Sequence, residues 1–234
     1  YNNGIKSKDD LKITEGTINV VSVDDGIIGK DMVAIENATV TINAGGDGIK
    51  ATNDTDSALG YVRIDSGTLN ITAVNDGIQG VSAVTINGGV LNISSGVGSA
   101  NSINNSSSSL YNPGSSMSSS SSEEESSSGK GIKSSSAITI SGGSITVDSA
   151  DDAVHSNDAV TVSGGELTLN SGDDGMHADT SLIISGGSIT ITKSYEGLES
   201  ATITLTDGTI YITSSDDGIN CAGGADSSST SGRA

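Results

Sequence analysis

A repeat of 22 residues is the feature that most constrains the fold of this chain. Three consecutive copies, ITISGGSITVDSADDAVHS, VTVSGGELTLNSGDDGMHA and LIISGGSITITKSYEGLES, begin at Ile138, Val160 and Leu182, so each starts 22 residues after the one before. Related copies run from Ile5 to Ile219 and make about eight rungs. A fixed period of this length predicts a solenoid, because one unit cannot bury its own apolar face and must stack on its neighbours.

Each copy contains two runs of alternating β-branched residues and one shorter apolar piece. Alternation with period two indicates strands, and Gly-Gly and Asp-Gly mark the corners between them. The prediction is therefore an all-β fold, a parallel β-helix with three strands per rung, and the usual crossover preference makes it right-handed. A β-sandwich of unrelated hairpins would not keep this register. The third strands should supply one inward column: Ile5, Ile27, Ile49, Ile78, Ile132, Val154, Met176, Leu198 and Ile219.

Composition agrees with one repetitive domain over residues 1–234. The chain has 32 glycines and lacks both tryptophan and phenylalanine, so its interior must consist of Val, Ile and Leu. Two insertions interrupt the repeat: a short one around TNDTDSALG, between a third and a first strand, and a Ser-rich inserted loop over residues 98–128. The serine-rich segment cannot bury a core, which favours a loop, and residues 223–234 form a polar C-terminal tail.

The charge balance excludes some classes of partner. A net charge of −19 with only 10 basic residues argues against nucleic acid, whose phosphates need Lys and Arg. No apolar stretch of about 20 residues is present, so no membrane span is expected. The single cysteine, Cys221, cannot form an internal disulfide.

Acidic residues return to one corner of every rung. Carboxylates about 5 Å apart repel by about 3 kcal/mol at an effective dielectric constant near 20, and hard divalent cations relieve such crowding by binding about six to eight oxygens. Calcium is therefore the expected cofactor. The alternative is turn chemistry alone, in which Asp bonds the backbone and Gly adopts positive φ. The candidate metal ligands are Asp24, Asp25, Asp151, Asp152, Asp173, Asp174, Glu196, Glu199, Asp216 and Asp217.

One outward column follows this corner and contains both histidines. His155, His177, Glu199 and Asn220 share it with Lys6, Ile28, Lys50, Gln79 and Lys133. Glu196 and Glu199 lie three residues apart on one rung and next to Asp173 and Asp174, which makes this cluster the first expected metal site. Asp151 and Asp152 form the second. The histidines are either ligands or exposed side chains that bond nearby acids.

The stretch SGGSITITKSYEGLES, preceded by DDGMHAD, resembles a clostridial family of secreted carbohydrate-binding proteins with a polysaccharide-lyase-like right-handed β-helix. The resemblance covers nearly the whole repeat region. It implies an extracellular or cell-surface protein that binds calcium and attaches to cellulose and to acidic plant polysaccharide such as polygalacturonate. It also implies that Asp151, Asp152, Asp173, Asp174, Glu196 and Glu199 carry calcium. The Ser-rich insert departs from the family pattern and lies at the edge of the acidic corner.

Three functions remain open on the sequence. The first is a non-catalytic binder in which calcium bridges the protein to uronate carboxylates, with Tyr195, Tyr211, His177 and Lys193 as ligand contacts. The second is a calcium-dependent lyase, for which Lys193, or less favourably Lys133, would be the base. The third is a homo-oligomer or fibre subunit that stacks through the open β-helix ends. The outward threonines are too often replaced by Asn and Tyr for an ice-binding array.

Overall fold

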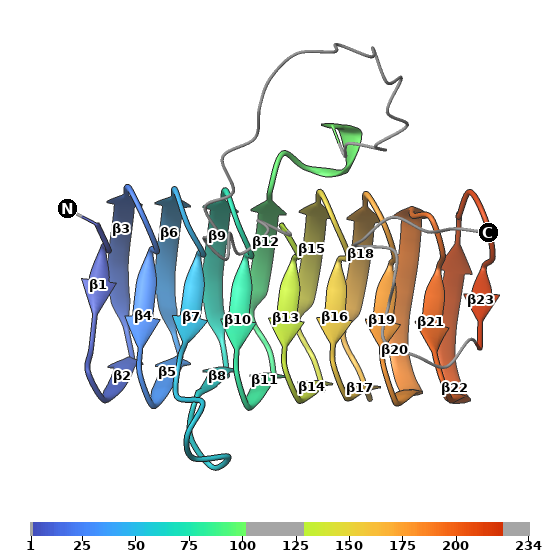
Figure 1. The fold of residues 1–234 in the computed structure, drawn as a ribbon, viewed down its shortest axis with the longest axis horizontal. Coiled ribbons are helices and arrows are strands. Elements are labelled where there is room, and N and C mark those ends of the chain that lie inside the picture. Colours follow the sequence, from blue (N-terminus) through green and yellow to red (C-terminus); the bar gives the residue numbers. More distant parts are fainter. Residues whose placement is uncertain (1, 102–128, 222–234) are drawn as a thin grey trace, which may run out of the picture.

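The computed structural model describes residues 2–101 and 129–221 and shows the predicted parallel β-helix (Figure 1). Every strand pair in it is parallel, and partners on successive rungs are mostly 22 residues apart, as in the pairing of Ile5 with Ile27. Nine short strands stack into one sheet, which gives a solenoid of about nine turns. They are β1 (Ile5–Lys6), β4 (Ile27–Gly29), β7 (Ile49–Ala51), β10 (Ile78–Gly80), β13 (Ile132–Ser134), β16 (Val154–Ser156), β19 (Met176–Ala178), β21 (Leu198–Ser200) and β23 (Ile219–Asn220).

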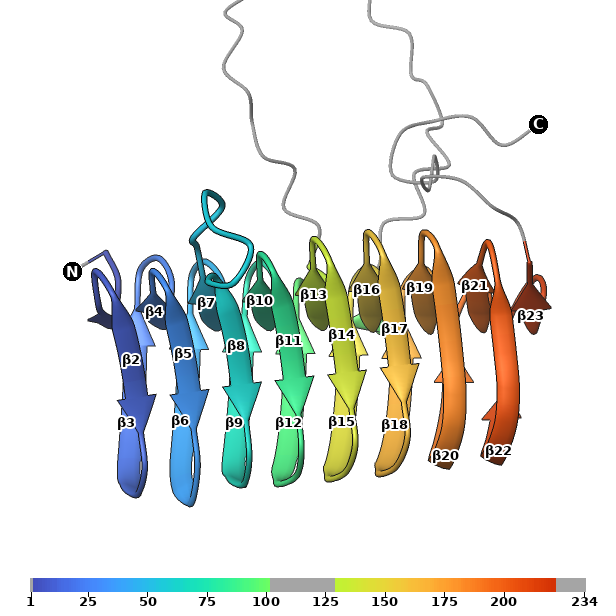
Figure 2. The same ribbon diagram turned by 90° about the horizontal axis from the view of Figure 1, so that it is seen from below.

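The first and second strands of the rungs form the other sheet, which has 14 strands (Figure 2). The first strands are β2 (Asp10–Ile13), β5 (Met32–Ile35), β8 (Tyr61–Ile64), β11 (Ala83–Ile86), β14 (Ala137–Ile140) and β17 (Ala159–Val162). The second strands are β3 (Gly16–Ser22), β6 (Ala38–Ala44), β9 (Gly67–Ala73), β12 (Val90–Ser95), β15 (Ser144–Ser149) and β18 (Glu166–Ser171). In the last two rungs both runs belong to one strand, β20 (Ser181–Lys193) and β22 (Ile203–Ile212).

The predicted inward columns make up the core. From Ile27 to Leu198, every residue of the third-strand column is fully buried. Residues of the outermost rungs, such as Ile18 and Ile212, pack against this core but stay partly exposed. Stacking therefore buries the aliphatic columns along the axis, as the alternation of apolar residues predicted.

Both insertions leave the coil at corners. The chain loops out between β7 and β8, and the segment that begins the Ser-rich insert forms a short 3-10 helix, η1 (Ser99–Asn101). Residues 102–128 and the polar tail at 223–234 lie outside the described residues. In the part that the structure describes, no helix is long and apolar enough to cross a membrane.

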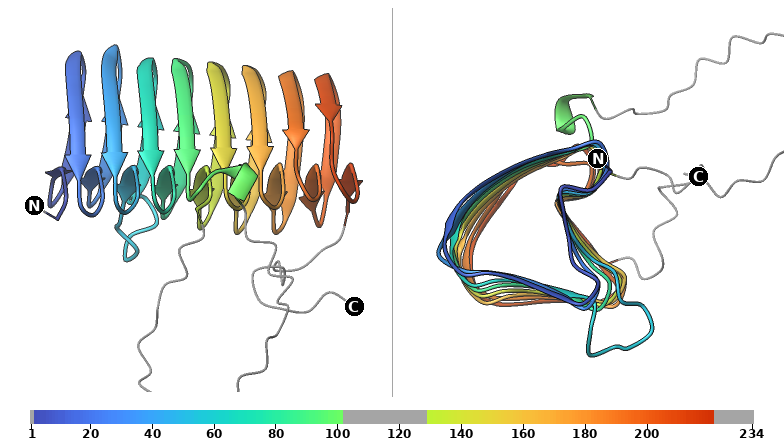
Figure 3. Two further views of the ribbon diagram at one scale, coloured as in Figure 1. Left: turned by 90° about the horizontal axis from the view of Figure 1, so that it is seen from above. Right: turned by 90° about the vertical axis from the view of Figure 1, so that its left-hand side faces the viewer.

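Viewed along the axis, the rungs superpose into one outline that is indented on the side of the short strands (Figure 3, right). The outward side chains of the short strands lie on this indented side, and those of Ile28, His155 and His177 are buried there (Figure 3). Residues 22, or sometimes more, apart in sequence become direct neighbours along it: Lys6 pairs with Ile28, Ile28 with Lys50, and His155 with His177. Lys50, Lys133, His155, His177 and Glu199 all lie on the short strands of this side.

A column of glycines precedes the short strands because there is no room for a Cβ. At Gly77 a Cβ would lie 2.3 Å from Ile93 Cγ2 and 2.6 Å from the carbonyl oxygen of Gly131. The same conflict with a β-branched methyl group and a main-chain carbonyl recurs at other rungs. Ala153 occupies this position on one rung, where the core residue at the place of Ile93 is Leu169, which has no branch at Cβ.

Candidate functional site

Acidic residues form a column at the corner that precedes the short strands, interrupted on one rung by Lys130. We call Asp25, Asp47, Asp76, Asp152, Asp174, Glu196 and Asp217 the acidic column. One carboxylate oxygen of each aspartate through Asp174 accepts the main-chain N–H of the residue one rung along: the distance is 2.8 Å from Asp47 N to Asp25 Oδ1 and 3.0 Å from Asp76 N to Asp47 Oδ1. Turn chemistry therefore explains one oxygen of each of these side chains.

The second oxygen of most of these aspartates faces a cationic or imidazole side chain. Lys50 Nζ lies 2.7 Å from Asp47 Oδ2, and Lys133 Nζ lies 3.0 Å from Asp76 Oδ2. Both lysines belong to the outward column of the short strands, which the sequence placed beside this corner. The repulsion that led us to expect calcium along the whole corner is thus relieved in part by the protein's own side chains.

Lys130 is the residue that sequence reasoning missed. It occupies the acidic-column position on the rung of Ile132, and its Nζ lies 2.6 Å from Asp152 Oδ2 and 3.0 Å from Asp151 Oδ2. Lys130 is buried and Asp152 is fully buried. The sequence Lys-Gly-Ile aligns with Asp-Gly-Ile of other rungs, so the signal was present at the far side of the insertion.

Two clusters of side chains that could hold a metal ion regroup the predicted ligands: Asp173 joins Asp151 and Asp152, whereas Asp174 and Glu199 join His177. The first, the oxygen cluster, is Asp151, Asp152 and Asp173, whose carboxylate oxygens lie within 4.8 Å of one another. It offers only oxygen atoms, the ligands that calcium prefers. Lys130 already contacts two of its members, so a cation here would compete with the ammonium group.

The second, the histidine cluster, is Asp174, His177 and Glu199. His177 Nδ1 lies 3.5 Å from Asp174 Oδ2 and 3.3 Å from Glu199 Oε2. His177 is 1% exposed and its Nε2 lies 3.2 Å from Asp179 Oδ1. The expectation of exposed histidines was therefore wrong: both rings are buried, because outward side chains converge on the indented side of the coil.

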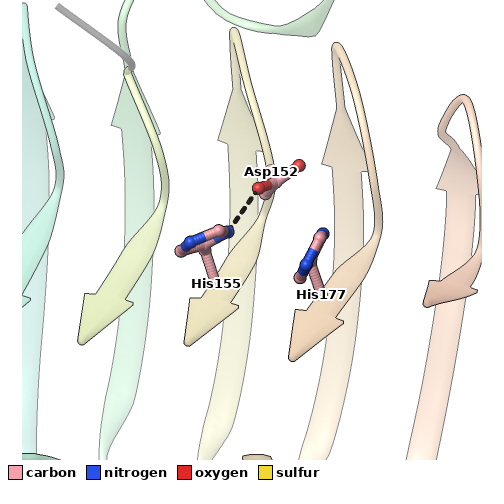
Figure 4. Close-up of side chains that lie close together, drawn as sticks. All are labelled: Asp152, His155 and His177. Carbon is pink, nitrogen blue, oxygen red and sulfur yellow. Dashed lines mark hydrogen bonds and ion pairs between the residues drawn. The ribbon is translucent and has the colours of Figure 1, made fainter. Parts of the chain in front are cut away.

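A third group that could hold a metal contains Asp152, His155 and His177 (Figure 4). Here both nitrogens of His155 are already bonded, Nδ1 to Asp152 Oδ2 at 2.7 Å and Nε2 to Asn157 Oδ1 at 3.0 Å. The rings of His155 and His177 are 5.0 Å apart and tilted. His155 therefore orients Asp152, and it has no nitrogen left for an ion.

The other predicted ligands do not join these clusters. Glu196 turns to Asn220, whose Nδ2 donates to both carboxylate oxygens at 3.0 and 2.9 Å. Asp216 accepts a hydrogen bond from the Tyr195 hydroxyl, and it and Asp217 are exposed on the last rung. Asp24 and Asp25 lie at the opposite end, where they line a groove.

That groove is lined by four of the ten basic residues of this acidic chain. We call it the lysine groove; it has a volume of about 620 Å³ and its cationic residues are Lys6, Lys8, Lys30 and Lys50. Ile28 also lines the groove, but its side chain is buried, at 4% exposure. Among the described residues, no ion pair joins Lys6, Lys8 or Lys30 to a carboxylate. Neither Lys8 nor Lys30 could be recognised as part of a groove from the sequence, because both lie in turns between strands.

A comparison with protein families identifies the family to which this chain belongs. A family model described as a carbohydrate-binding domain-containing protein matches residues 1–175 and, in a second alignment, residues 173–218. The chain belongs to this family. Two alignments to one family model are expected for a repetitive chain, because rungs at different places in the chain can match the same part of the model. No curated protein and no solved structure matches the chain.

In this carbohydrate-binding domain the remaining predicted ligand contacts are scattered. Tyr211 is 66% exposed on β22, in the 14-stranded sheet. Lys193, the candidate lyase base, donates a hydrogen bond to the carbonyl oxygen of Ser99 and so ties the end of β20 to η1. That bond gives Lys193 a structural role.

The carboxylates of the oxygen cluster and of the histidine cluster have different neutralising partners. Burial alone would raise the pKa of Asp152, but the Lys130 ammonium and His155 outweigh it and lower this pKa below its usual range. Burial raises the pKa of Asp174 to about 6. Burial would lower the pKa of His177, but the attraction of Asp174, Asp152 and Glu199 raises it to about 9. The histidine cluster thus attracts a positive charge onto its imidazole.

Substitutions of Asp47 test whether the acidic column needs a negative charge or only an oxygen that accepts a main-chain N–H. Burial raises the pKa of Asp47, so the ionised form is disfavoured in the folded state and stability falls as pH rises through that pKa. Asp47→Asn keeps an oxygen for the N–H of Asp76 and is expected to change the unfolding free energy by less than about 0.5 kcal/mol at pH 7. Asp47→Ala leaves that N–H unsatisfied and should cost about 1–2 kcal/mol.

Urea unfolding followed by circular dichroism measures both Asp47 variants. Equal losses for the asparagine and alanine variants would show that the charge, and not the acceptor oxygen, is what this position requires.

Proposed function

We propose that this carbohydrate-binding domain binds an acidic polysaccharide of the polygalacturonate type without cleaving it. The lysine groove carries the proposal. A chain of net charge −19 repels polyanions, and it nevertheless gathers Lys6, Lys8, Lys30 and Lys50 around one groove. Plant polysaccharide lies outside cells, so an extracellular or cell-surface location belongs to the same proposal.

The groove suits an acidic sugar for two reasons. Lysine ammonium groups pair with carboxylates, and at least Lys6, Lys8 and Lys30 are exposed to solvent. Asp24 and Asp25 at the rim can accept hydrogen bonds from sugar hydroxyls.

Calcium belongs to the proposal at the oxygen cluster. Asp151 and Asp173 are half-buried and could share a hard cation with uronate carboxylates, since calcium completes its shell with ligand oxygens. Bound there, calcium would supply a bridge between two anions that otherwise repel. The cluster lies four rungs along from the lysine groove, about 19 Å at the usual strand spacing, so one extended chain could meet both.

Calorimetry with polygalacturonate tests the proposal, with sedimentation on insoluble cellulose as the neutral comparison. We expect binding to polygalacturonate that weakens as salt rises, because exposed charge pairs are screened. Chelation should weaken it further if calcium bridges the ligand. Stronger retention on cellulose, independent of salt, would instead identify a neutral glucan as the ligand.

A triple variant tests the groove itself. Lys6→Gln, Lys8→Gln and Lys30→Gln together are expected to weaken polygalacturonate binding by about tenfold, since each removes an exposed charge worth up to about 1 kcal/mol. Lys12→Gln is the matched control, because Lys12 is also exposed but faces Glu36 at 3.6 Å outside the groove. Equal affinity of the triple variant and the control would exclude the lysine groove as the binding site.

A further inference from the structure

We propose that the histidine cluster, Asp174, His177 and Glu199, binds a borderline divalent transition-metal ion such as Zn²⁺. This inference is independent of polysaccharide binding and concerns a different ion from calcium. It rests on one orphaned atom, on the distances around it and on the kinds of donor that surround it.

The orphaned atom is His177 Nδ1. It is buried, and within residues 2–101 and 129–221 no atom makes a hydrogen bond of acceptable geometry with it. Buried polar atoms nearly always have a partner, and those that do not call for a ligand or an ion. Nε2 faces Asp179 Oδ1 at 3.2 Å, which makes Nε2 the donor, so Nδ1 is the nitrogen that would bind an ion once the ion has displaced its proton.

The distances match a metal shell. Ligands at about 2.1 Å from a tetrahedral zinc ion are about 3.4 Å from one another. His177 Nδ1 is 3.3 Å from Glu199 Oε2 and 3.5 Å from Asp174 Oδ2. Both separations are close to the edge length of such a tetrahedron, and the ligand atoms of Asp174 and Glu199 lie within 4.8 Å of each other, so an ion bound by the three atoms would have one position left for water or a ligand.

The donors select the class of metal. One imidazole nitrogen with two carboxylates suits zinc and its neighbours, whereas calcium takes oxygen only. Asp179, on the far nitrogen of His177, completes the carboxylate–histidine–metal arrangement that fixes the ring in metal sites. His155 one rung away differs, because both of its nitrogens are bonded.

Such an ion would join two rungs. His177 on β19 and Glu199 on β21 are register partners on adjacent strands, and Asp174 comes from the corner before β19. Glu199 has a side chain that is 17% exposed, which gives the ion a path from solvent. Metal binding would therefore stabilise the C-terminal half of the stack.

The experiment uses tag-free full chain with Cys221→Ser, so that the exposed thiol cannot bind the ion. After chelation and buffer exchange, Zn²⁺ is titrated against a chromophoric chelator with millimolar Ca²⁺ present to saturate non-specific acidic sites. We expect one tight Zn²⁺ per chain. His177→Gln and Glu199→Gln should each weaken it at least tenfold, and His155→Gln should leave it unchanged.

A spectroscopic measurement keeps the test independent of folding defects in the variants. Co²⁺ bound to the unsubstituted histidine cluster should give the intense visible bands of a tetrahedral site, and Zn²⁺ should abolish them. Absence of stoichiometric Zn²⁺ binding, displacement by Ca²⁺ at equal concentration, or undiminished binding in both the His177 and Glu199 variants would overturn the proposal. None of these results bears on polygalacturonate affinity, which is measured separately.

Discussion

Replacing Lys130 with methionine is expected to lower the free energy of unfolding by about 3–5 kcal/mol. The side chain of Lys130 is 8% exposed, and its Nζ contacts two carboxylates, one of them the fully buried Asp152. Methionine keeps the aliphatic stem and removes the ammonium group. Asp152 would then keep only His155 and main-chain contacts against a nearby Asp151, and burial of that charge would be largely uncompensated.

Urea unfolding measures this loss, and Lys133→Met is the matched control. Lys133 also bonds one carboxylate of the column, Asp76 at 3.0 Å, but its own side chain is 26% exposed. The Lys133 side chain borders solvent, so water can take the place of its ammonium group beside Asp76, and we expect a smaller loss of about 1 kcal/mol. Equal losses for the two variants would contradict the view that Lys130 is the internal counter-ion of the corner.

The same Lys130 variant reports on calcium. Without the ammonium group, the oxygen cluster presents three carboxylates within 4.8 Å and no built-in cation. Millimolar Ca²⁺ is therefore expected to restore much of the lost stability in Lys130→Met and to shift the parent protein less. If calcium stabilises both proteins equally, the ion binds elsewhere and the oxygen cluster is not its site.

The fold could be predicted from the sequence because each rung obeys the same two rules. Alternation fixed which residues face inward, and the 22-residue step fixed which residues stack, so the column from Ile27 to Leu198 is buried as expected. Insertions did not disturb this prediction, because the columns resume on the far side of each one. Register in a solenoid repeats locally, and a local pattern can be read without knowledge of distant contacts.

The candidate site could be predicted only in part. The pattern placed the carboxylates in one column but did not show what neutralises them, because Lys130 stands beyond the insertion and breaks the acidic pattern. The same pattern predicted that His177 points outward from the coil, but it did not predict that its side chain is buried. Outward side chains are buried here because the short strands line the indented side of the coil, and that shape depends on the corner angles of all rungs (Figure 3).

Lys8 and Lys30 show a further limit of sequence reasoning. They lie in turns, where no alternation indicates a direction, and each is an ordinary surface lysine when read alone. Only the stacking of successive rungs gathers them with Lys6 and Lys50 around one groove. A grouping of charges across rungs therefore cannot be recognised from the order of residues along the chain.

Replacing Gly77 with alanine is expected to cost about 3 kcal/mol, because the new methyl group meets Ile93 Cγ2 and a main-chain oxygen that cannot move freely. The chain already contains a rung that tolerates alanine, where Ala153 is accompanied by Leu169. The double variant Gly77→Ala/Ile93→Leu should therefore be more stable than the two single losses predict, by about 1 kcal/mol or more.

A double-mutant cycle measured by urea unfolding decides whether this pairing is the cause. Gly218→Ala on the last rung is the control, since a Cβ there has no described atom within 4 Å, and its effect should stay within about 0.5 kcal/mol. Strict additivity of the Gly77 and Ile93 substitutions would mean that the carbonyl oxygen alone excludes a side chain. The Ala153 rung would then have to accommodate its methyl group by a shift of the main chain, which would move the corner that carries Asp151 and Asp152.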